Sequence, residues 1–122
     1  MRKKRRKNTE TEIYKKKAWQ TFSKWIRTRD KKCFTCSGKP ENAGHFWHNV
    51  LDFDEENIHG QCVRCNKWLS GNLATYAVNL LALLGKERFD ALTIRHYRAL
   101  KGEKRSVEEY KELIHKYTLD KK

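Results

Sequence analysis

The four cysteines of this chain form two C-x-x-C pairs, and this arrangement restricts the fold more than any other feature of the sequence. The pairs are Cys33 with Cys36 and Cys62 with Cys65, and the chain holds no fifth cysteine. Two such pairs can place four thiolates around one ion, which is the tetrahedral set that structural Zn²⁺ prefers. We therefore expect one zinc ion bound by all four cysteines.

Two disulfides and a thioredoxin-like redox pair are the alternatives to zinc. Disulfides require an oxidising compartment, and the charged N-terminus is followed by polar residues instead of the apolar segment of a secretory signal. A redox pair is typically a single C-x-x-C at a turn of a parallel sheet, and no parallel-sheet pattern is visible. No apolar stretch approaches the ~20 residues of a membrane span, so we expect no membrane partner.

Positive charge is concentrated near the start of the chain. Residues 1–32 carry 14 of the 28 Lys and Arg but only three of the 15 acidic residues, which places +11 of the formal charge of +13 there. A basic segment on a nearly neutral body indicates a polyanionic partner. Nucleic acid is favoured over anionic lipid, because no acylation signal or strongly amphipathic basic helix accompanies the segment. The candidate DNA-binding residues are Arg2, Lys3, Lys4, Arg5, Arg6, Lys7, Lys15, Lys24 and Arg27.

The hydrophobic pattern predicts an α+β fold that is mostly α. Residues 1–11 are almost without apolar side chains and are expected to form a disordered basic arm, followed by a single domain over residues 12–122. Helical spacing of apolar residues predicts a helix over residues 12–29. Mixed apolar and polar segments predict two short antiparallel strands within residues 42–50 and 53–61, around a polar loop.

The second cysteine pair leads into a predicted helix that begins near Asn66. The order of cysteine pair, strand, loop, strand, cysteine pair and helix predicts a ββα unit over residues 33–69, held at its base by zinc. Residues 70–122 are expected to be helical. One helix should end at Gly85, a second should cover residues 87–100, and a third should begin at Ser106, where Glu109 completes a capping box.

Histidine and asparagine residues inside and beside the cysteine frame suggest hydrolysis of phosphodiesters. A divalent ion can neutralise the phosphate and stabilise the leaving oxygen, while an imidazole with an ordinary pKa of about 6.5 removes a proton from water. Each residue alone would more often be an ordinary hydrogen-bonded or capping side chain. The candidate residues are His45, His48, Asn57, His59 and Asn66.

Several blocks of the sequence resemble the NinG/Rap family of phage recombination nucleases. They are residues 43–46 (AGHF), 53–66 (FDEENIHGQCVRCN) and 70–72 (SGN), and residues 22–30 before the first cysteine pair fit the same family. The resemblance covers about residues 19–85. It implies a zinc-supported HNH-type (ββα-metal) fold and an endonuclease that cleaves branched recombination intermediates of DNA. It also implies a phage or prophage protein that acts in the cytoplasm of a bacterial host.

The HNH pattern implies a role for individual residues of this chain. His45 matches the general base, and Asn57 matches the asparagine that braces the loop and the base. Asn66 matches a ligand of the catalytic ion, which would be Mg²⁺ or Mn²⁺. An asparagine directly after C-x-x-C is also similar to the phage junction resolvase endonuclease VII.

Gly44 departs from the HNH pattern, because many HNH enzymes have a metal-binding aspartate at this position. His48, Asp54 or His59 could supply the missing ligand, or water could complete the coordination, as Mg²⁺ tolerates. A rival alignment with the resolvase makes His48 the base in place of His45. We prefer His45, because the whole block of residues 43–46 fits the NinG/Rap family.

Two other functions are compatible with the same sequence. The chain could be a non-catalytic zinc-containing DNA-binding module, or a protein-interaction module that uses its helical C-terminal part. Composition does not distinguish DNA from RNA as the nucleic acid. Cleavage of a DNA junction in two strands requires two active sites, so we expect a homodimer, although the sequence shows no dimer surface.

Overall fold

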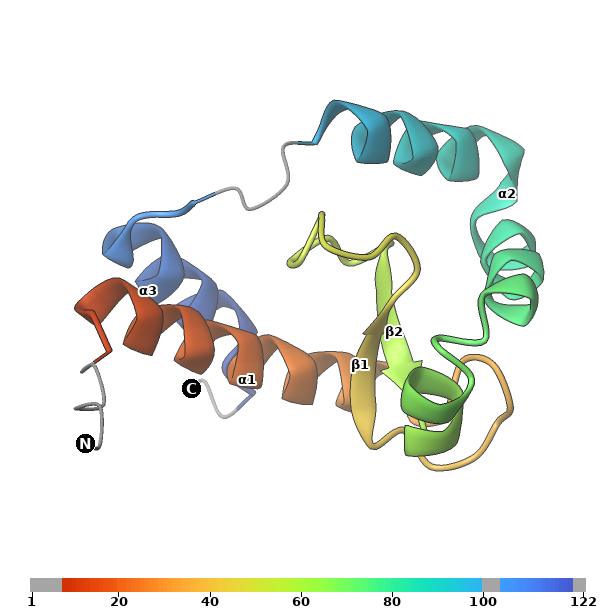
Figure 1. Cartoon of the computed structure of the whole chain (residues 1–122), viewed down its shortest axis with the longest axis horizontal. Helices are drawn as coiled ribbons and strands as arrows, with labels where there is room; N and C mark the ends of the chain where they lie inside the picture. The colour runs from red at the N-terminus through yellow and green to blue at the C-terminus, as the bar shows by residue number, and fades with distance from the viewer. Residues whose placement is uncertain (1–7, 100–103, 120–122) are drawn as a thin grey trace, which may run out of the picture.

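A short antiparallel hairpin lies in the middle of the molecule, with helices packed on both of its sides (Figure 1). The computed structural model describes residues 8–99 and 104–119. Its elements are α1 (Glu10–Asp30), β1 (Asn42–His45), β2 (Ile58–Gln61), the π-helix η1 (Arg64–Trp68), α2 (Leu73–Arg98) and α3 (Val107–Tyr117). The mostly helical α+β class that the sequence predicts is confirmed.

Helix α1 begins two residues before the predicted start, because Thr9 caps it. The Thr9 side chain accepts a hydrogen bond from the Glu12 backbone at 3.2 Å, which satisfies one of the free N–H groups of the first turn. The helix ends at Asp30 and is capped by Lys31, whose φ of 63° is left-handed. The predicted apolar stripe of α1 is buried against the hairpin and α3.

The two strands are shorter than the sequence predicts. Residues 46–50 and 53–57 belong to the connecting loop instead of continuing the ladder, and only four residues of each strand pair. Asn49 and Leu51 have positive φ values of 67° and 55°, which interrupt any extended conformation. The pairing register sets Gly44 opposite His59 and His45 opposite Ile58.

The hairpin separates two hydrophobic clusters. One cluster joins α1, β2 and α3, and its buried members are Phe22, Ile26, Ile58 and Tyr117. The other is built from α2 and packs against the loop after β1, and its buried members are Tyr76, Leu80, Leu84 and Leu92. Because successive residues of a strand point to opposite faces, His45 and Ile58 share one face of the hairpin, while Gly44 and His59 share the other.

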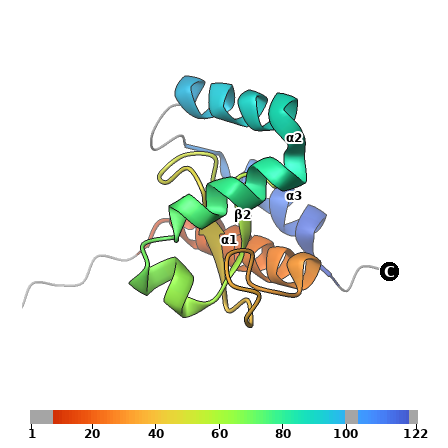
Figure 2. The ribbon, with the colours of Figure 1, turned by 90° about the vertical axis from the view of Figure 1, so that its right-hand side faces the viewer.

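The C-terminal half follows the predicted order of elements with local differences. The helix expected from Asn66 is instead the π-helix η1, which begins at Arg64. Helix α2 is bent at Gly85, where φ is 77° and ψ is 166°, so the first helical segment ends where predicted and a second resumes at an angle (Figure 2). The capping box of Ser106 and Glu109 is present at the start of α3. None of the described helices is long and apolar enough to cross a membrane.

Candidate active site and metal centre

The four cysteine sulfurs converge on one point. All four ligand atoms lie within 4.8 Å of one another, and the Cys36 and Cys62 sulfurs are 3.5 Å apart. Sulfurs bound to one Zn²⁺ at about 2.3 Å would lie roughly 3.8 Å apart in a tetrahedron. The Cys65 backbone N–H also points to the Cys62 sulfur at 3.4 Å. The ligand set that the sequence predicts for structural zinc is therefore assembled.

The cysteine cluster is tied directly to the hairpin. The Phe34 N–H, inside the first pair, donates to the Gly60 carbonyl of β2 at 2.8 Å. The Gln61 side chain donates to the Thr35 hydroxyl at 3.1 Å and to the Gly71 carbonyl at 2.8 Å. A metal that holds the cysteines would consequently fix the position of both strands.

His45, the predicted general base, is the last residue of β1 and is held from two sides. Its Nε2 lies 3.0 Å from Asp52 Oδ1, and its ring stacks on Trp19 with centroids 5.3 Å apart. The hydrogen bond from His45 holds the pKa of Asp52 below its ordinary value, and the positive charges of Lys15 and Arg105 act in the same direction. An ionised Asp52 accepts a hydrogen bond from Nε2–H, and this tautomer of the neutral ring leaves the lone pair on Nδ1.

The Asp52 partner of His45 was not identified from the sequence. Asp52 lies seven residues beyond His45 in a polar loop and belongs to no spacing pattern. The Nδ1 atom of His45 makes no hydrogen bond within residues 8–99 and 104–119. A histidine with one nitrogen held by a carboxylate and the other unoccupied has the arrangement of a general base.

Asn57 is fully buried and holds the loop that follows β1. Its Oδ1 accepts from the Trp47 N–H at 2.8 Å, and its Nδ2 donates to the Trp47 carbonyl at 3.0 Å. Weaker contacts of 3.4 Å reach the carbonyls of Val50 and Leu51. These bonds replace the ladder that longer strands would have made, and they match the bracing role that the resemblance implies for Asn57.

His48, the rival base, lies near His45. The two ring centroids are 6.4 Å apart. Burial lowers the pKa of His48, and the neighbouring His45 lowers it further. A β-carbon built on Gly71 would lie 3.3 Å from His48 Nε2. The His48 ring thus lies close to the turn that follows η1.

The space beside Gly44 is filled by two amide side chains. A β-carbon built on Gly44 would overlap Gln61 Oε1 and would lie 2.9 Å from Asn66 Oδ1. Gln61 is fully buried, and its Oε1 has no hydrogen-bond partner among the residues that the structure describes. Asn66, the predicted ligand of the catalytic ion, therefore lies close to Gln61 Oε1, an oxygen that the sequence did not indicate as a ligand.

His59 is part of the core on the opposite face of the hairpin from His45. Its Nδ1 is 3.1 Å from the Tyr76 hydroxyl, which donates to the Gly44 carbonyl at 2.8 Å. Its ring stacks on Phe34 with centroids 4.1 Å apart. Burial lowers the pKa of His59 to about 4. His59 is thus a neutral, hydrogen-bonded side chain at neutral pH and does not lie beside His45.

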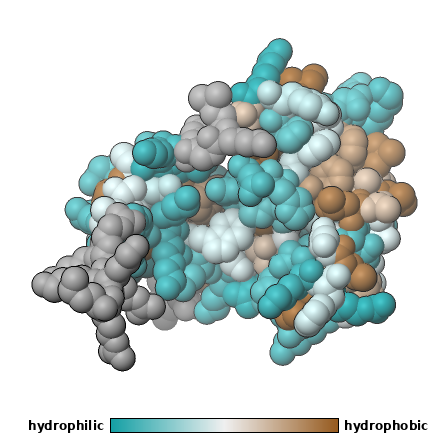
Figure 3. All heavy atoms as spheres, viewed as in Figure 1, coloured by the Kyte–Doolittle hydropathy of each residue, from teal (hydrophilic) through white to brown (hydrophobic). Residues whose placement is uncertain are grey.

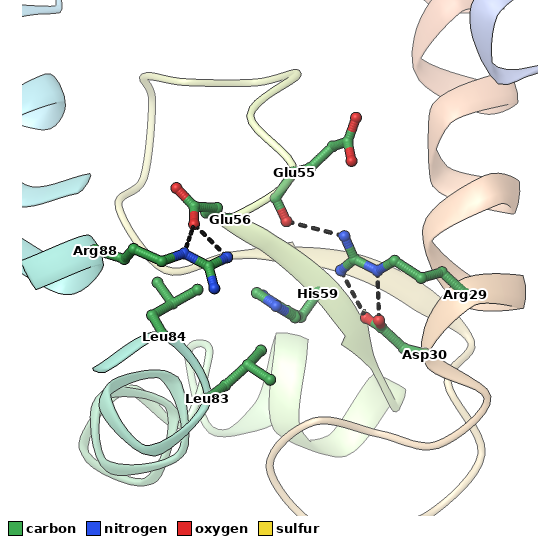
Figure 4. A pocket seen from close by; sticks show the side chains of 8 residues that line it. All are labelled: Arg29, Asp30, Glu55, Glu56, His59, Leu83, Leu84 and Arg88. Atoms are coloured by element: carbon green, nitrogen blue, oxygen red, sulfur yellow. Dashed lines mark hydrogen bonds and ion pairs between the residues drawn. The ribbon is translucent and has the colours of Figure 1, made fainter. Parts of the chain in front are cut away.

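His59 borders a hollow of about 340 Å³ between α1, α2 and the loop (Figure 4). The charged side chains around this hollow already have partners. Arg29 bonds to Asp30 and Arg88 bonds to Glu56, while the Glu55 carboxylate accepts from Tyr117 outside the hollow. The hollow is therefore a poor site for a charged substrate.

Asp54, another candidate to replace the ligand missing at Gly44, is already engaged. Its carboxylate accepts from Arg95 at 2.9 Å and from the backbone N–H groups of Glu56 and Asn57. Arg95 also reaches the Glu56 carboxylate at 2.9 Å. Asp54 thus links the loop to α2, and metal binding would break this contact.

Three of the predicted DNA-binding residues are described, and these three do not share one face of α1. Residues 2–7 lie outside the described residues. Lys15 and Lys24 are both exposed on α1, but a separation of nine residues places them half a turn apart. Arg27 is half-buried, with its Nε bonded to the Ser23 carbonyl at 3.2 Å. Of these three described residues, Lys15 alone lies close enough to Asp52 to lower its pKa.

Lys15 shares a hollow of about 430 Å³ with Lys104 and Arg105. Arg105 also lies over the Phe53 ring, 5.0 Å from its centroid. The surface over α1 and α3 is mainly hydrophilic, whereas hydrophobic side chains gather over α2 (Figure 3). Although Glu12 also lines this hollow, Lys15 and Arg105 bring positive charge close to Asp52.

Comparison with known proteins gives a single family. The family model described as Bacteriophage Lambda NinG protein matches residues 1–122. The chain is 39% identical over 92 residues to Protein ninG of Escherichia phage 933W, covering 68% of this chain and 46% of that protein. It is 38% identical over 92 residues to Protein ninG of Escherichia phage lambda, with 68% and 45% covered. The chain spans less than half the length of these curated relatives. No solved structure matches the chain significantly.

Proposed function

The chain belongs to the NinG family of phage proteins, and we propose that it is a metal-dependent DNA endonuclease with a structural zinc, acting on branched recombination intermediates. The observation that carries this proposal is the His45–Asp52 pair, with its 3.0 Å hydrogen bond, at the end of a strand fixed by the four-cysteine cluster. The branched substrate rests on the resemblance of the sequence to phage recombination nucleases.

In the proposed reaction, His45 removes the proton from the attacking water. The lone pair of Nδ1 accepts this proton, while Asp52 keeps the ring oriented through Nε2 and stabilises the imidazolium that forms. Trp19 limits rotation of the ring by stacking on it. Asn57 holds the loop and so keeps the start of the turn after His45 in place.

The residues beside Gly44 fit a hard divalent ion. Asn66 Oδ1 and the unpartnered Gln61 Oε1 are oxygen donors of the type that Mg²⁺ and Mn²⁺ accept. A divalent ion bound there would neutralise the scissile phosphate and stabilise the leaving oxygen. Because Gly44 and His45 face opposite sides at the end of β1, the phosphate would have to lie across the end of this strand to contact both the ion and the base.

The Lys15 hollow supplies a path for the DNA backbone to reach His45. Lys15, Lys104 and Arg105 line this hollow, and Lys15 and Arg105 exert their charge on Asp52. Contacts of this kind recognise phosphates without reading bases. They suit a nuclease that selects DNA by its branched shape.

One observation favours a second function, a non-catalytic zinc-containing DNA-binding module. Within residues 8–99 and 104–119, the cysteines are the only group of three or more His, Cys, Asp and Glu residues placed to hold a metal. A catalytic ion would therefore depend on amide ligands and water. The second function predicts DNA binding without cleavage under any divalent metal.

The deciding experiment measures cleavage of end-labelled four-way junction, flap and linear duplex DNA by zinc-loaded protein. Reactions with Mg²⁺ or Mn²⁺ are compared with reactions without added metal, because chelators would also remove zinc. We expect metal-dependent cuts concentrated on the branched substrates. Tight binding without cuts would overturn the nuclease proposal in favour of the binding module.

The His45→Ala variant tests the base, with His115→Ala as the matched control. His115 is exposed on α3, so its loss should leave cleavage unchanged. Loss of a general base typically lowers the rate by about 10²–10⁴-fold, while DNA binding and zinc content should stay at the parental level. Cleavage by His45→Ala at the parental rate would show that His45 is not the base.

A further inference from the structure

Building on the proposed nuclease function, we propose that Gln61 and Asn66 together bind the divalent ion through their amide oxygens beside Gly44, on the face of the hairpin opposite to the His45 ring. The sequence pattern pointed to Asn66, with His48, Asp54 or His59 as further candidates, and did not indicate Gln61. The two residues flank the second cysteine pair, with Gln61 at the end of β2 and Asn66 in η1.

The orientation of the Gln61 amide is set by its neighbours. Its Nε2 donates to the Gly71 carbonyl at 2.8 Å and to the Thr35 hydroxyl at 3.1 Å. A carbonyl oxygen can only accept, so the nitrogen side of the amide must face Gly71. The oxygen side must therefore face Gly44 and Asn66.

The oxygens of Gln61 and Asn66 meet at the absent side chain of Gly44. A β-carbon at this position would overlap Gln61 Oε1 and lie 2.9 Å from Asn66 Oδ1. Both oxygens are thus close to a single point. Mg²⁺ binds oxygen at about 2.1 Å, so one ion can bridge two oxygens that lie this close after small side-chain rotations.

Gln61 Oε1 is an unusual atom, because it is buried and accepts no hydrogen bond from the described part of the chain. A buried carbonyl without a donor is destabilising unless another partner satisfies it. A cation would provide that partner. Asn66 is only partly buried, so an ion at this position could still reach water or a DNA phosphate.

The ligand set explains what kind of ion binds and how strongly. Amide oxygens suit Mg²⁺ and Mn²⁺ and are poor ligands for softer metals. His48 Nε2 lies beside Gly71, whose carbonyl accepts from Gln61, so His48 is the nearby candidate for a further ligand. With no carboxylate, the site should bind metal weakly in free protein and gain affinity when DNA adds a phosphate.

Paramagnetic broadening in the zinc-loaded wild-type protein tests the proposal without any substitution. Substoichiometric Mn²⁺ should broaden the side-chain NH₂ signals of Gln61 and Asn66 first. The side-chain amides of Gln20, exposed on α1, and Asn79, bonded to the Phe34 carbonyl, are the controls. If the signals of Gln61 and Asn66 persist while those of the controls or the acidic loop broaden, the ion binds elsewhere and the proposal is overturned.

A single substitution gives a second test in the direction of tighter binding. Asn66→Asp adds a carboxylate to the site, so its Mn²⁺ affinity should rise about tenfold, because ligand charge is a main determinant of affinity for such ions. Gln20→Glu, which adds the same charge at an exposed position of α1, is the matched control and should leave the affinity unchanged. An unchanged affinity for Asn66→Asp would mean that Asn66 instead turns its nitrogen to Gln61 and the two amides simply hydrogen-bond to each other.

These results separate the ligand proposal from the nuclease proposal. Selective broadening without DNA cleavage would support the ion site and overturn the nuclease. Cleavage without broadening at Gln61 and Asn66 would support the nuclease and overturn this ligand assignment.

Discussion

Acid should destabilise this protein through His59, by an amount that the structure allows us to estimate. Burial lowers the pKa of His59 to about 4 in the folded protein, and nearby Asp30 only partly offsets this effect. The unfolded chain should have the ordinary value near 6.5. Because the unfolded state binds the proton more readily, the stability from a neutral His59 is fully present above pH 6.5 and is lost as the pH falls towards 4.

The size of the effect follows from these two pKa values. Lowering the pH from 7.5 to 5.0 should remove about 2 kcal/mol of the free energy of unfolding through His59 alone. The measurement is urea unfolding of the zinc-loaded protein at both pH values, followed by circular dichroism, with zinc content determined in parallel. Acid also weakens zinc binding, because thiolates must stay deprotonated, so the informative quantity is a difference between variants.

His59→Gln provides that difference, because glutamine keeps a hydrogen-bonding group near Tyr76 but does not titrate in this range. Wild-type protein should lose about 2 kcal/mol more than His59→Gln between the two pH values. His115→Gln removes an exposed histidine and should follow the wild type. Equal losses for wild type and His59→Gln would refute the claim that His59 is held neutral by burial.

Three further predictions concern zinc, the loop and the basic arm. Cys62→Ser should lose zinc and unfold the hairpin region, because structural zinc contributes directly to folding. Full metal content in this variant, with an unchanged melting temperature, would exclude the four-cysteine site. Arg95→Ala should lower the free energy of unfolding by about 1 kcal/mol, because the partly exposed Arg95 is the shared donor to the carboxylates of Asp54 and Glu56. A change below about 0.5 kcal/mol in urea unfolding, the size usual for surface sites, would show that this contact does not hold the loop. Deletion of residues 2–7 should weaken DNA binding and make its affinity less dependent on salt concentration. If fluorescence anisotropy titrations give the same salt dependence of affinity as for the wild type, the arm does not contact phosphate.

Features encoded by neighbouring residues were predictable from the sequence. The cysteine spacing gave the metal ligand set, and the pattern of Ser106 and Glu109 gave the start of α3. Gly85 marked the bend of α2, because only glycine readily adopts its φ of 77°. Each of these signals depends on a few residues close in the chain, so tertiary packing did not override it.

Features that depend on distant contacts were not predictable. Strand length failed because Asn57 draws the loop towards Trp47 across ten residues, and no periodicity records that contact. Asp52 and Gln61 were missed for the same reason. Asp52 contacts His45 only after the loop folds back. Gln61 fills the space beside Gly44 only after the strands pair. The catalytic roles of His45, His48 and Asn66 remain predictions.

The proposed zinc and ion sites should depend on each other, because they share the same short segments. A hairpin with four-residue strands is only marginally stable on its own, so the cysteine cluster must contribute much of the order in this region. Gln61 directly precedes Cys62, and Asn66 directly follows Cys65. Loss of zinc would therefore release both amide oxygens from the space beside Gly44 before it disturbed the packing of α1 on α3, which rests on its own hydrophobic cluster. The zinc-free protein should consequently keep helical circular dichroism while losing the Mn²⁺ broadening of both side chains.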